Sequence, residues 1–497
     1  MLNVIFYKPA QTKTTSFEEY DETGKLVTTT LTEIFHPIRD FACETMTSAN
    51  GLLSYEENFE GFKGSMESLS NADSLFEHSS IKFVHGEKEN ELADFSSVVM
   101  CENMFTGCDE LESVKINLDS LTEANSLFKD MPNLKEIELK ADSLREADEM
   151  FKGTSISYFG CDLPLLESAK GMFNSVITNE DFIFDSQMPS LKYASEMFKN
   201  VKISSFECDL SSLEDASYMF EGITVQVPEN ESISNFVFVS STPKLKNAPG
   251  MFKGVQMSDL SGITSNALEN ASEMFYGNNS ITSVLFNTPS LKNSTSMFEN
   301  CEYLSSYEGD LRNIEIMDKM FKMAGSKVTG AWGINSLKIK SLEKLKSAKE
   351  TFYRSGLRKW TTKMPSLEDA SNMFAYSTFL SSFESDLSSL KNGTNMFGSC
   401  PLKYFRAELC SLENGDEMFG KSILDPESVM YIIDSLPFYD EGDHKITIGI
   451  NCQNSLSELN SFAYTASYQS WSILKTYITN KGWTVTWKDS AGNVINF

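Results

Sequence analysis

The stretch SLREADEMFKG at residues 143–153 returns with few changes as SLEDASYMFEG at residues 212–222. With the Phe of each copy taken as an anchor, the same pattern occurs fifteen times in the 497-residue chain. Ten of the fourteen intervals between successive anchors are 22 or 23 residues long. A fixed period of this length is typical of repeat architectures, in which each unit packs against its neighbours. The anchors are Phe76, Phe105, Phe128, Phe151, Phe173, Phe198, Phe220, Phe252, Phe275, Phe298, Phe321, Phe352, Phe374, Phe397 and Phe419.

Each repeat places apolar residues at the same distances before its anchor. Seven residues before it stands Leu in thirteen repeats, with Val98 and Ile314 in the other two. Ala precedes the anchor by four residues in ten repeats, and Met directly precedes it in twelve. This i, i+3, i+7 spacing predicts a two-turn helix with one apolar face. Gly153 and Asn200, two residues after their anchors, favour the left-handed conformation that ends a helix.

An extended segment follows each anchor, as in Leu134-x-x-Ile137-x-Leu139. Its alternation predicts a short strand with apolar side chains turned inward. One strand and one helix cannot bury their apolar faces alone, so neighbouring units must stack. We therefore expect an α/β repeat solenoid, with one short parallel strand and one short helix per 22–23-residue unit. The Met-Phe stripe is then the core of the stack rather than a cofactor groove.

The two ends of the chain depart from the repeat. Residues 1–65 predict an N-terminal β-containing cap or docking element, with strands over 2–7 and 26–32. The repeats occupy residues 66–420, and residues 421–497 predict a C-terminal α+β cap. In that cap we expect helices over 427–436 and 468–480, a strand over 445–450, and a terminal hairpin from residue 483. Caps cover the open ends of a solenoid, and attachment to a partner is the alternative role.

The net charge of −28 disfavours nucleic acid and anionic membranes as partners. No apolar run approaches the length of a membrane span. The first seven residues lack the basic and apolar regions of a signal peptide and predict a strand instead. Among nine cysteines, Cys108, Cys301 and Cys400 each follow an anchor by three residues. This shared phase predicts small buried residues rather than disulfides or metal ligands.

The sequence contains no recognised catalytic pattern. Its four histidines show no HExxH spacing, and GxSxG, P-loop and Rossmann motifs are absent. We therefore predict a protein that is not an enzyme and has no cofactor and no metal. A glycosidase, which needs only two carboxylates, is the enzymatic alternative. Recurrent Asp-Leu pairs such as Asp310-Leu311 are expected to be solvated, with a weak Ca²⁺ site as the alternative.

A basic segment interrupts the acidic chain at residues 322–363. It holds eleven Lys or Arg against two acids, a local charge of +9. Exposed tryptophan beside arginine is the composition of an interface hot spot, so this segment, with Trp332 and Trp360 expected at the surface, is a candidate docking patch. The alternative is that its cations neutralise the acidic repeats next to them. The candidate binding residues are Trp332, Lys338, Lys340, Arg354, Arg358, Lys359 and Trp360.

The stretch MFTGCDELESV at residues 104–114 resembles the core of BspA-type leucine-rich repeats, and MFENCEYL at residues 297–304 matches it too. The resemblance covers about residues 66–420 and implies a leucine-rich-repeat solenoid. Proteins of this type occur on bacterial and protist surfaces and among virion genes of tailed phages. The resemblance therefore implies a non-enzymatic structural or recognition protein. Its expected partners are other proteins, virion or host surface components, and it could form an oligomer within a particle. A virion location is the first expectation, a cell-surface adhesin the second and a cytosolic scaffold the third.

Overall fold

The computed structural model describes residues 3–7, 11–20, 26–35, 40–42, 46–56, 59–226, 234–263, 265–328, 333–452 and 455–495. Its internal contacts divide the chain into two compact units. The first contains Met1–Leu210 and Thr224–Gln226, and the second contains Ser211–Ile223 and Val227–Phe497. Both combine short strands with many turns, and the three helices of the described residues all belong to the second unit.

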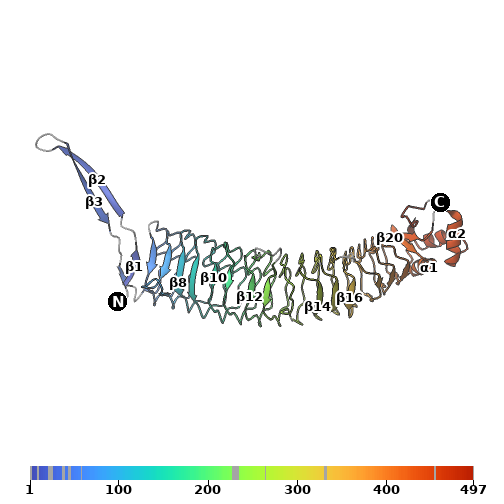
Figure 1. Ribbon diagram of the computed structural model, residues 1–497, viewed down its shortest axis with the longest axis horizontal. Coiled ribbons are helices and arrows are strands. Elements are labelled where there is room, and N and C mark those ends of the chain that lie inside the picture. The colour runs from blue at the N-terminus through green and yellow to red at the C-terminus, as the bar shows by residue number, and fades with distance from the viewer. Residues whose placement is uncertain are drawn as a thin grey trace. The chain divides into compact units, whose positions relative to one another are not determined.

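The first unit is built from short parallel strands preceded by antiparallel ones (Figure 1). β2 and β3 form an antiparallel hairpin, and β1 lies between β4 and β5, antiparallel to both. β5, β6, β8 and β9 are parallel neighbours, β7 also pairs with β8, and β10 pairs with β11. The strands expected over 2–7 and 26–32 are therefore confirmed as β1 and β3. The strands of this unit are β1 (Asn3–Tyr7), β2 (Gln11–Tyr20), β3 (Leu26–Phe35), β4 (Asp40–Ala42), β5 (Gly61–Lys63), β6 (Phe83–His85), β7 (Ala93–Asp94), β8 (Ser113–Asn117), β9 (Glu136–Lys140), β10 (Tyr158–Phe159), β11 (Ile183–Phe184) and β12 (Ser205–Glu207).

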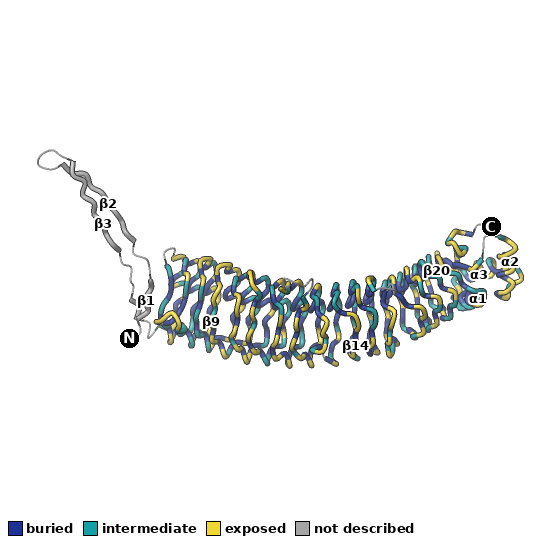
Figure 2. The backbone as a smooth tube through the Cα atoms, viewed as in Figure 1, coloured by how far each residue is buried: buried dark blue, intermediate teal, exposed yellow. Residues whose placement is uncertain are grey.

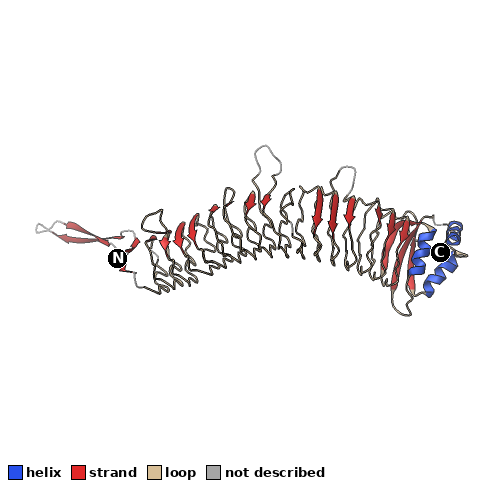
Figure 3. Ribbon diagram, turned by 90° about the horizontal axis from the view of Figure 1, so that it is seen from below, coloured by secondary structure: helices blue, strands red, loops and turns tan. Residues whose placement is uncertain are grey.

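The second unit continues with parallel strands and ends in an α/β element. β14, β15 and β16 form one parallel sheet, and β17, β18 and β19 form another. β20, β21 and β22 form a parallel sheet beside the helices, which Figure 3 shows in blue. The elements are β13 (Val237–Val239), β14 (Ser283–Asn287), β15 (Ser306–Asp310), β16 (Ser336–Ile339), β17 (Lys359–Trp360), β18 (Ser382–Glu384), β19 (Tyr404–Arg406), β20 (Gly415–Leu424), α1 (Pro426–Ser435), β21 (His444–Ile450), α2 (Leu456–Thr465), α3 (Trp471–Asn480) and β22 (Trp483–Lys488).

Most elements expected near the C-terminus are present. α1 and β21 match the helix over 427–436 and the strand over 445–450, and α3 is shorter than the helix expected over 468–480. An antiparallel bridge between Lys488 and Val494 begins the expected terminal hairpin, whose last two residues lie outside the described ones. The sequence patterns did not predict α2.

The prediction of one helix per repeat is wrong. Around Phe151 the chain forms three successive tight turns, in which Met150, Lys152 and Thr154 donate N–H groups to carbonyls three residues earlier, at 3.1–3.3 Å. In all fifteen repeats the residue two before the anchor has a positive φ, as Glu149 does at 55°. A left-handed residue cannot continue a right-handed helix. The segment before each anchor is therefore a run of turns.

Hydrogen bonds between coils explain why turns replace the helix. Ala147, Glu149 and Phe151 donate their N–H groups to Ser168, Lys170 and Met172 of the next coil, at 2.7–2.9 Å. Every second N–H thus bonds to the neighbouring coil while the others close the turns, so the buried backbone is satisfied. A left-handed non-glycine residue costs about 1–2 kcal/mol. The bonds between coils offset this strain, and a helix, whose N–H groups bond internally, could not form them.

The aromatic anchors form the core of each unit. All fifteen Phe side chains are at most 1% exposed, which confirms the predicted core. Successive rings stack with their centres 5.1–5.6 Å apart from Phe76 to Phe198 in the first unit. From Phe220 to Phe419 in the second unit the distances are 5.3–5.9 Å. Figure 2 shows buried and exposed residues alternating around the coils.

A coil with the same bonding precedes the first anchor. Leu53, 23 residues before Phe76, is buried and donates its N–H to Leu75 at 3.0 Å. Gly51 likewise donates to Asp73 at 3.0 Å. The predicted cap at residues 1–65 thus contains a coil that is bonded like the repeats, with Leu53 in the place of the Phe anchor.

The three cysteines at the shared phase are buried, as predicted, and have free thiols. The thiols of Cys108, Cys301 and Cys400 donate to Phe carbonyls of the preceding coils at 2.9–3.1 Å. Burial raises the pKa of Cys301 and of Cys400 to about 12. These thiols therefore stay protonated and contribute to packing.

Candidate functional site

A cleft opens in the second unit where two parallel sheets fail to join. β16 is the last strand of the sheet β14-β15-β16, and β17 is the first strand of the next sheet. Within the described part of the chain, no strand pairing connects β16 with β17. The cleft between them has a volume of about 630 Å³. It is lined by Asn335, Ser336, Leu337, Ile339, Gly356, Leu357, Arg358, Lys359, Trp360, Thr361, Thr362 and Phe379.

The two coils are held together just before these strands begin. The N–H of Gly356 donates to the carbonyl of Ile334 at 3.0 Å. Gly333 has a φ of 100°, and a Cβ on it would lie 2.2 Å from the carbonyl oxygen of Arg354, so glycine permits this close approach. The coils meet at this point, and the cleft lies beyond it.

Two cations at the cleft have no acidic partner. Arg358 and Lys359 are exposed, and within the described residues neither forms an ion pair. No Asp or Glu of the described residues lines the cleft. The guanidinium of Arg358 lies 5.2 Å from the centre of the Phe379 ring, a cation–π contact that orients it. The cleft is thus a positively charged site in a strongly acidic chain.

Lys338 and Lys340, by contrast, already have partners. Lys338 lies 2.9 Å from Glu308, and Lys340 lies 3.6 Å from Asp310. Asp310, which was expected to be solvated, is instead buried, at 2% exposed, with its carboxylate bonded to Arg312. Arg312 and, with it, Lys340 hold the pKa of that carboxyl below its usual value. The geometry of these two lysines agrees with the alternative interpretation, in which the cations neutralise acids of the neighbouring repeats. The same holds for the pairs Lys322–Glu350, Lys327–Glu302, Lys346–Glu315 and Lys349–Asp369.

The remaining candidate residues have different surroundings. Arg354 is exposed and lies over the rings of Tyr353 and Tyr376 at 5.9 and 5.8 Å. Trp332 lies outside the described residues. The structure therefore brings Arg358, Lys359 and Trp360 together at the cleft and leaves Arg354 beside it in the chain, on an aromatic surface.

The expectation of an exposed Trp360 is wrong. Its side chain is 4% exposed and packs against the rings of Phe352 and Phe374 at 5.0 and 5.3 Å. Its indole N–H donates to the carbonyl of Thr362 at 2.9 Å. Trp360 pairs in register with Phe383, 23 residues later. That repeat spacing is the sequence signal that could have placed Trp360 in the core.

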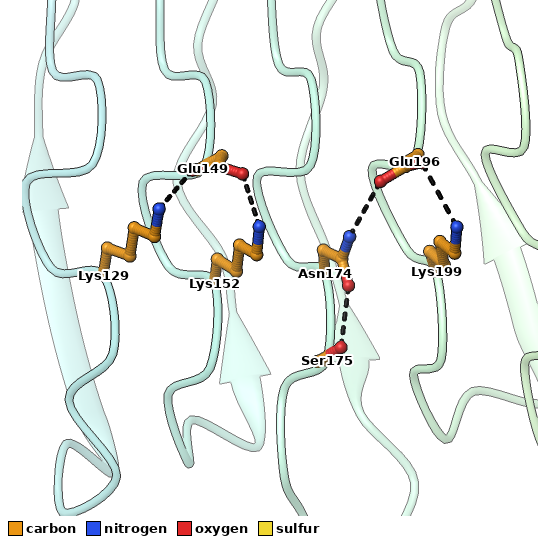
Figure 4. A network of polar contacts seen from close by, with 7 residues as sticks. All are labelled: Lys129, Glu149, Lys152, Asn174, Ser175, Glu196 and Lys199. Atoms are coloured by element: carbon orange, nitrogen blue, oxygen red, sulfur yellow. Dashed lines mark hydrogen bonds and ion pairs between the residues drawn. The ribbon is translucent and has the colours of Figure 1, made fainter.

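The first unit carries a surface on which the charges are paired (Figure 4). Glu149 accepts hydrogen bonds from Lys129, one coil earlier, at 2.6 Å and from Lys152. These bonds, that from Lys129 first, hold the pKa of Glu149 below its usual value. Further along, Glu196 accepts from Asn174 at 3.1 Å and from Lys199 at 3.2 Å. We call this set the paired ladder; its residues are Lys129, Glu149, Lys152, Asn174, Ser175, Glu196 and Lys199.

Neither a metal-binding cluster nor a membrane-spanning helix is found among the described residues. They contain no group of three or more His, Cys, Asp or Glu side chains that could hold a metal ion. None of their helices combines the length and the apolar character needed to cross a bilayer.

Comparisons with known proteins identify the repeat. The BspA type leucine rich repeat region matches residues 99–226 in six copies. The family described as a Mycoplasma protein of unknown function, DUF285, matches residues 187–308 and 307–408. A leucine-rich repeat protein from Bacteroides ovatus, known from a crystal structure, is 17% identical with a TM-score of 0.43, over 82% of this chain and 94% of that one. No curated protein matches this chain. Residues 99–226 therefore consist of leucine-rich repeats of the BspA type, and buried Phe anchors with a similar spacing continue to Phe419.

Proposed function

We propose that this protein is a non-enzymatic recognition protein that binds other proteins through the cleft between β16 and β17. The observation that carries the proposal is the pair Arg358 and Lys359. Six of the eleven cations of the same basic segment form ion pairs with acids of neighbouring coils, whereas these two face a cleft that no described acid lines. A cleft of this volume with a few charged groups placed beside it is typical of a binding site.

The proposal includes a solenoid in each unit as the support of its surface. Stacked rings and bonds between coils hold the strands in register, which suits a rigid binding surface. One uninterrupted stack through residues 66–420, and the caps proposed at 1–65 and 421–497, stay predictions.

Site-specific photocrosslinking tests the binding role. A photoreactive amino acid at Lys359 of the full chain is expected to form adducts with one partner protein. The same substitution at Lys391 is the control, because Lys391 is exposed, pairs with Glu368 and does not line the cleft. Adducts of equal yield at both positions, or at neither, would contradict the proposal. Hydrolysis of glycans by the purified chain would contradict its non-enzymatic part.

The setting of this binding is a finer proposal. The resemblance stated from the repeat sequence supports a phage virion component first and a cell-surface adhesin second. Mass spectrometry of purified particles, compared with peptides released by protease from intact cells, separates the two. We expect to recover the chain from particles, in a fixed ratio to capsid protein. Recovery from the cell surface alone would contradict the virion proposal and favour a cell-surface adhesin.

A further inference from the structure

The strand β16 turns half of its backbone groups toward the cleft. In a parallel ladder, successive residues direct their N–H and C=O groups to opposite neighbours. Ser336 and Lys340 donate their N–H groups to Ser305 and Gly309, at 3.2 and 3.3 Å, and therefore face β15. Leu337 and Ile339 lie between Ser336 and Lys340 and alternate with the residues that face β15. Their backbone N–H and C=O groups therefore point away from β15. Both residues line the cleft.

The strand β17 presents a matching edge from the other side. The carbonyl of Arg358 accepts the N–H of Ser381 at 3.1 Å, so Arg358 faces β18. Leu357, Lys359 and Thr361 alternate with it and line the cleft. In the described part of the chain, no strand pairs with either of these edges. The cleft is bordered by two parallel strand edges whose hydrogen-bonding groups are open.

The chemistry of the cleft restricts its occupant. An open strand edge is matched by the regularly spaced N–H and C=O groups of an extended peptide. Arg358 and Lys359 favour carboxylates, because no acid among the described residues neutralises them there. The charge of −28 opposes long polyanions such as nucleic acids, and a short acidic peptide meets less of this repulsion.

We propose that an extended acidic segment of a partner protein inserts between β16 and β17 as an added strand, with its carboxylates on Arg358 and Lys359. This proposal rests on the proposed protein-binding function and names the partner's chemistry. β16 has four residues, which span about 13 Å at roughly 3.3 Å per residue. The core of the bound segment is therefore about four or five residues long.

Fluorescence anisotropy with the full chain tests the inference. The probe is a fluorescein-labelled eight-residue peptide of alternating Glu and Thr. A second peptide carries N-methyl groups on alternate residues, which keeps the charge but removes hydrogen bonds to one strand edge. A third peptide has Lys in place of Glu. The protein variants are the double substitution Arg358→Glu/Lys359→Glu and the control Lys391→Glu, each checked for folding by circular dichroism.

The first peptide is expected to bind the wild-type chain and the Lys391→Glu control with affinities within twofold of each other. The double substitution, the N-methylated peptide and the Lys peptide should each weaken binding by at least about tenfold, because each removes charge or backbone pairing. Equal binding of the N-methylated peptide would overturn strand addition, and equal binding to the double variant would overturn the site.

Polyphosphate and heparin are the probes for other polyanions. If either binds in a way that depends on Arg358 and Lys359 while the Glu-Thr peptide does not bind, the peptide proposal is overturned. A protein adduct at Lys359 in the photocrosslinking experiment would then still support the broader proposed function, so failures of the two proposals are distinguishable.

Discussion

The paired ladder of the first unit and the cleft of the second are made from the same repeat but treat their charges in opposite ways. In the ladder, Glu149 forms ion pairs with Lys129 and Lys152. At the cleft, Arg358 and Lys359 have no acidic partner within the described residues. Both regions stand on fully buried stacked phenylalanines. The same buried core therefore supports surfaces with different charge arrangements. Cations without acidic partners and strand edges without a paired strand, as at the cleft, indicate a binding role rather than a structural one.

The rings and the surface charges of the two regions should contribute differently to the stability of the fold. Exposed ion pairs contribute about 0–1 kcal/mol each, so leaving two cations without partners has little effect on folding. Stacked rings contribute through buried area and through about 0.5–1.5 kcal/mol per aromatic pair. Stability should therefore depend on the rings in both regions, whereas the charges should matter differently in each.

The largest effect is expected from the shared core. Phe151→Ala in the first unit and Phe374→Ala beneath Trp360 should each lower the free energy of unfolding by about 3–5 kcal/mol, because both rings are fully buried between two others. Repeat arrays unfold in parts, so hydrogen exchange of peptides from each coil gives the local value. If Phe374→Ala cost less than about 1 kcal/mol, the cleft would not share the ladder's core, and the comparison would fail.

A smaller effect is expected in the paired ladder. Glu149→Gln should cost about 0.5–1 kcal/mol at neutral pH, since it removes two ion pairs from a partly exposed site. Glu138→Gln is the matched control, because Glu138 is exposed and has no ion pair within the described residues. Hydrogen exchange of the peptides that contain Lys129 and Lys152 measures the difference.

The cost of Glu149→Gln should depend on pH. The pKa of Glu149 is lowered in the folded chain by its bonds to Lys129 and Lys152. Its contribution is complete above the ordinary carboxyl pKa and is lost as the pH falls through the lowered, folded value. The difference between wild type and variant should therefore shrink on acidification. A difference that stayed constant down to strongly acidic pH would show that the ion pairs do not stabilise the ladder.

The smallest effect on stability is expected at the cleft. Arg358→Glu/Lys359→Glu should change the free energy of unfolding by about 0.5 kcal/mol, because neither cation has an ion pair to lose within the described residues and the substitution removes only the exposed cation–π contact of Arg358 with Phe379. Thermal and urea unfolding of the second unit, followed by tryptophan fluorescence, measures it. A loss larger than that of Glu149→Gln would mean that the cleft cations hold the fold, and would remove the contrast between the two regions.

Several local features could be predicted because neighbours in sequence decide them. The period of the Phe anchors predicted their burial. The position of Cys301 and Cys400, three residues after an anchor, predicted the burial of these thiols. α1 and β21 were predicted within two residues at each end. The basic segment was visible from composition, and it does contain the cations that border the cleft.

Other features were predicted wrongly because the residues that decide them lie in another coil. The spacing before Phe151 fits a helix and a run of turns equally well, since both place the same side chains inward. Trp360 was expected at the surface because only its neighbours in the chain were considered. The partners of Lys338 and Lys340 lie about 30 residues earlier, in the coil of β15.

Period and composition are local properties of the chain, so they were enough to predict the repeat, the inward side chains and the charge of each segment. Packing between coils selected turns over helices, since bonds such as that from Glu149 to Lys170 exist only once coils stack. It also decided which cations are neutralised and where β16 and β17 part, because both depend on contacts between residues more than twenty positions apart.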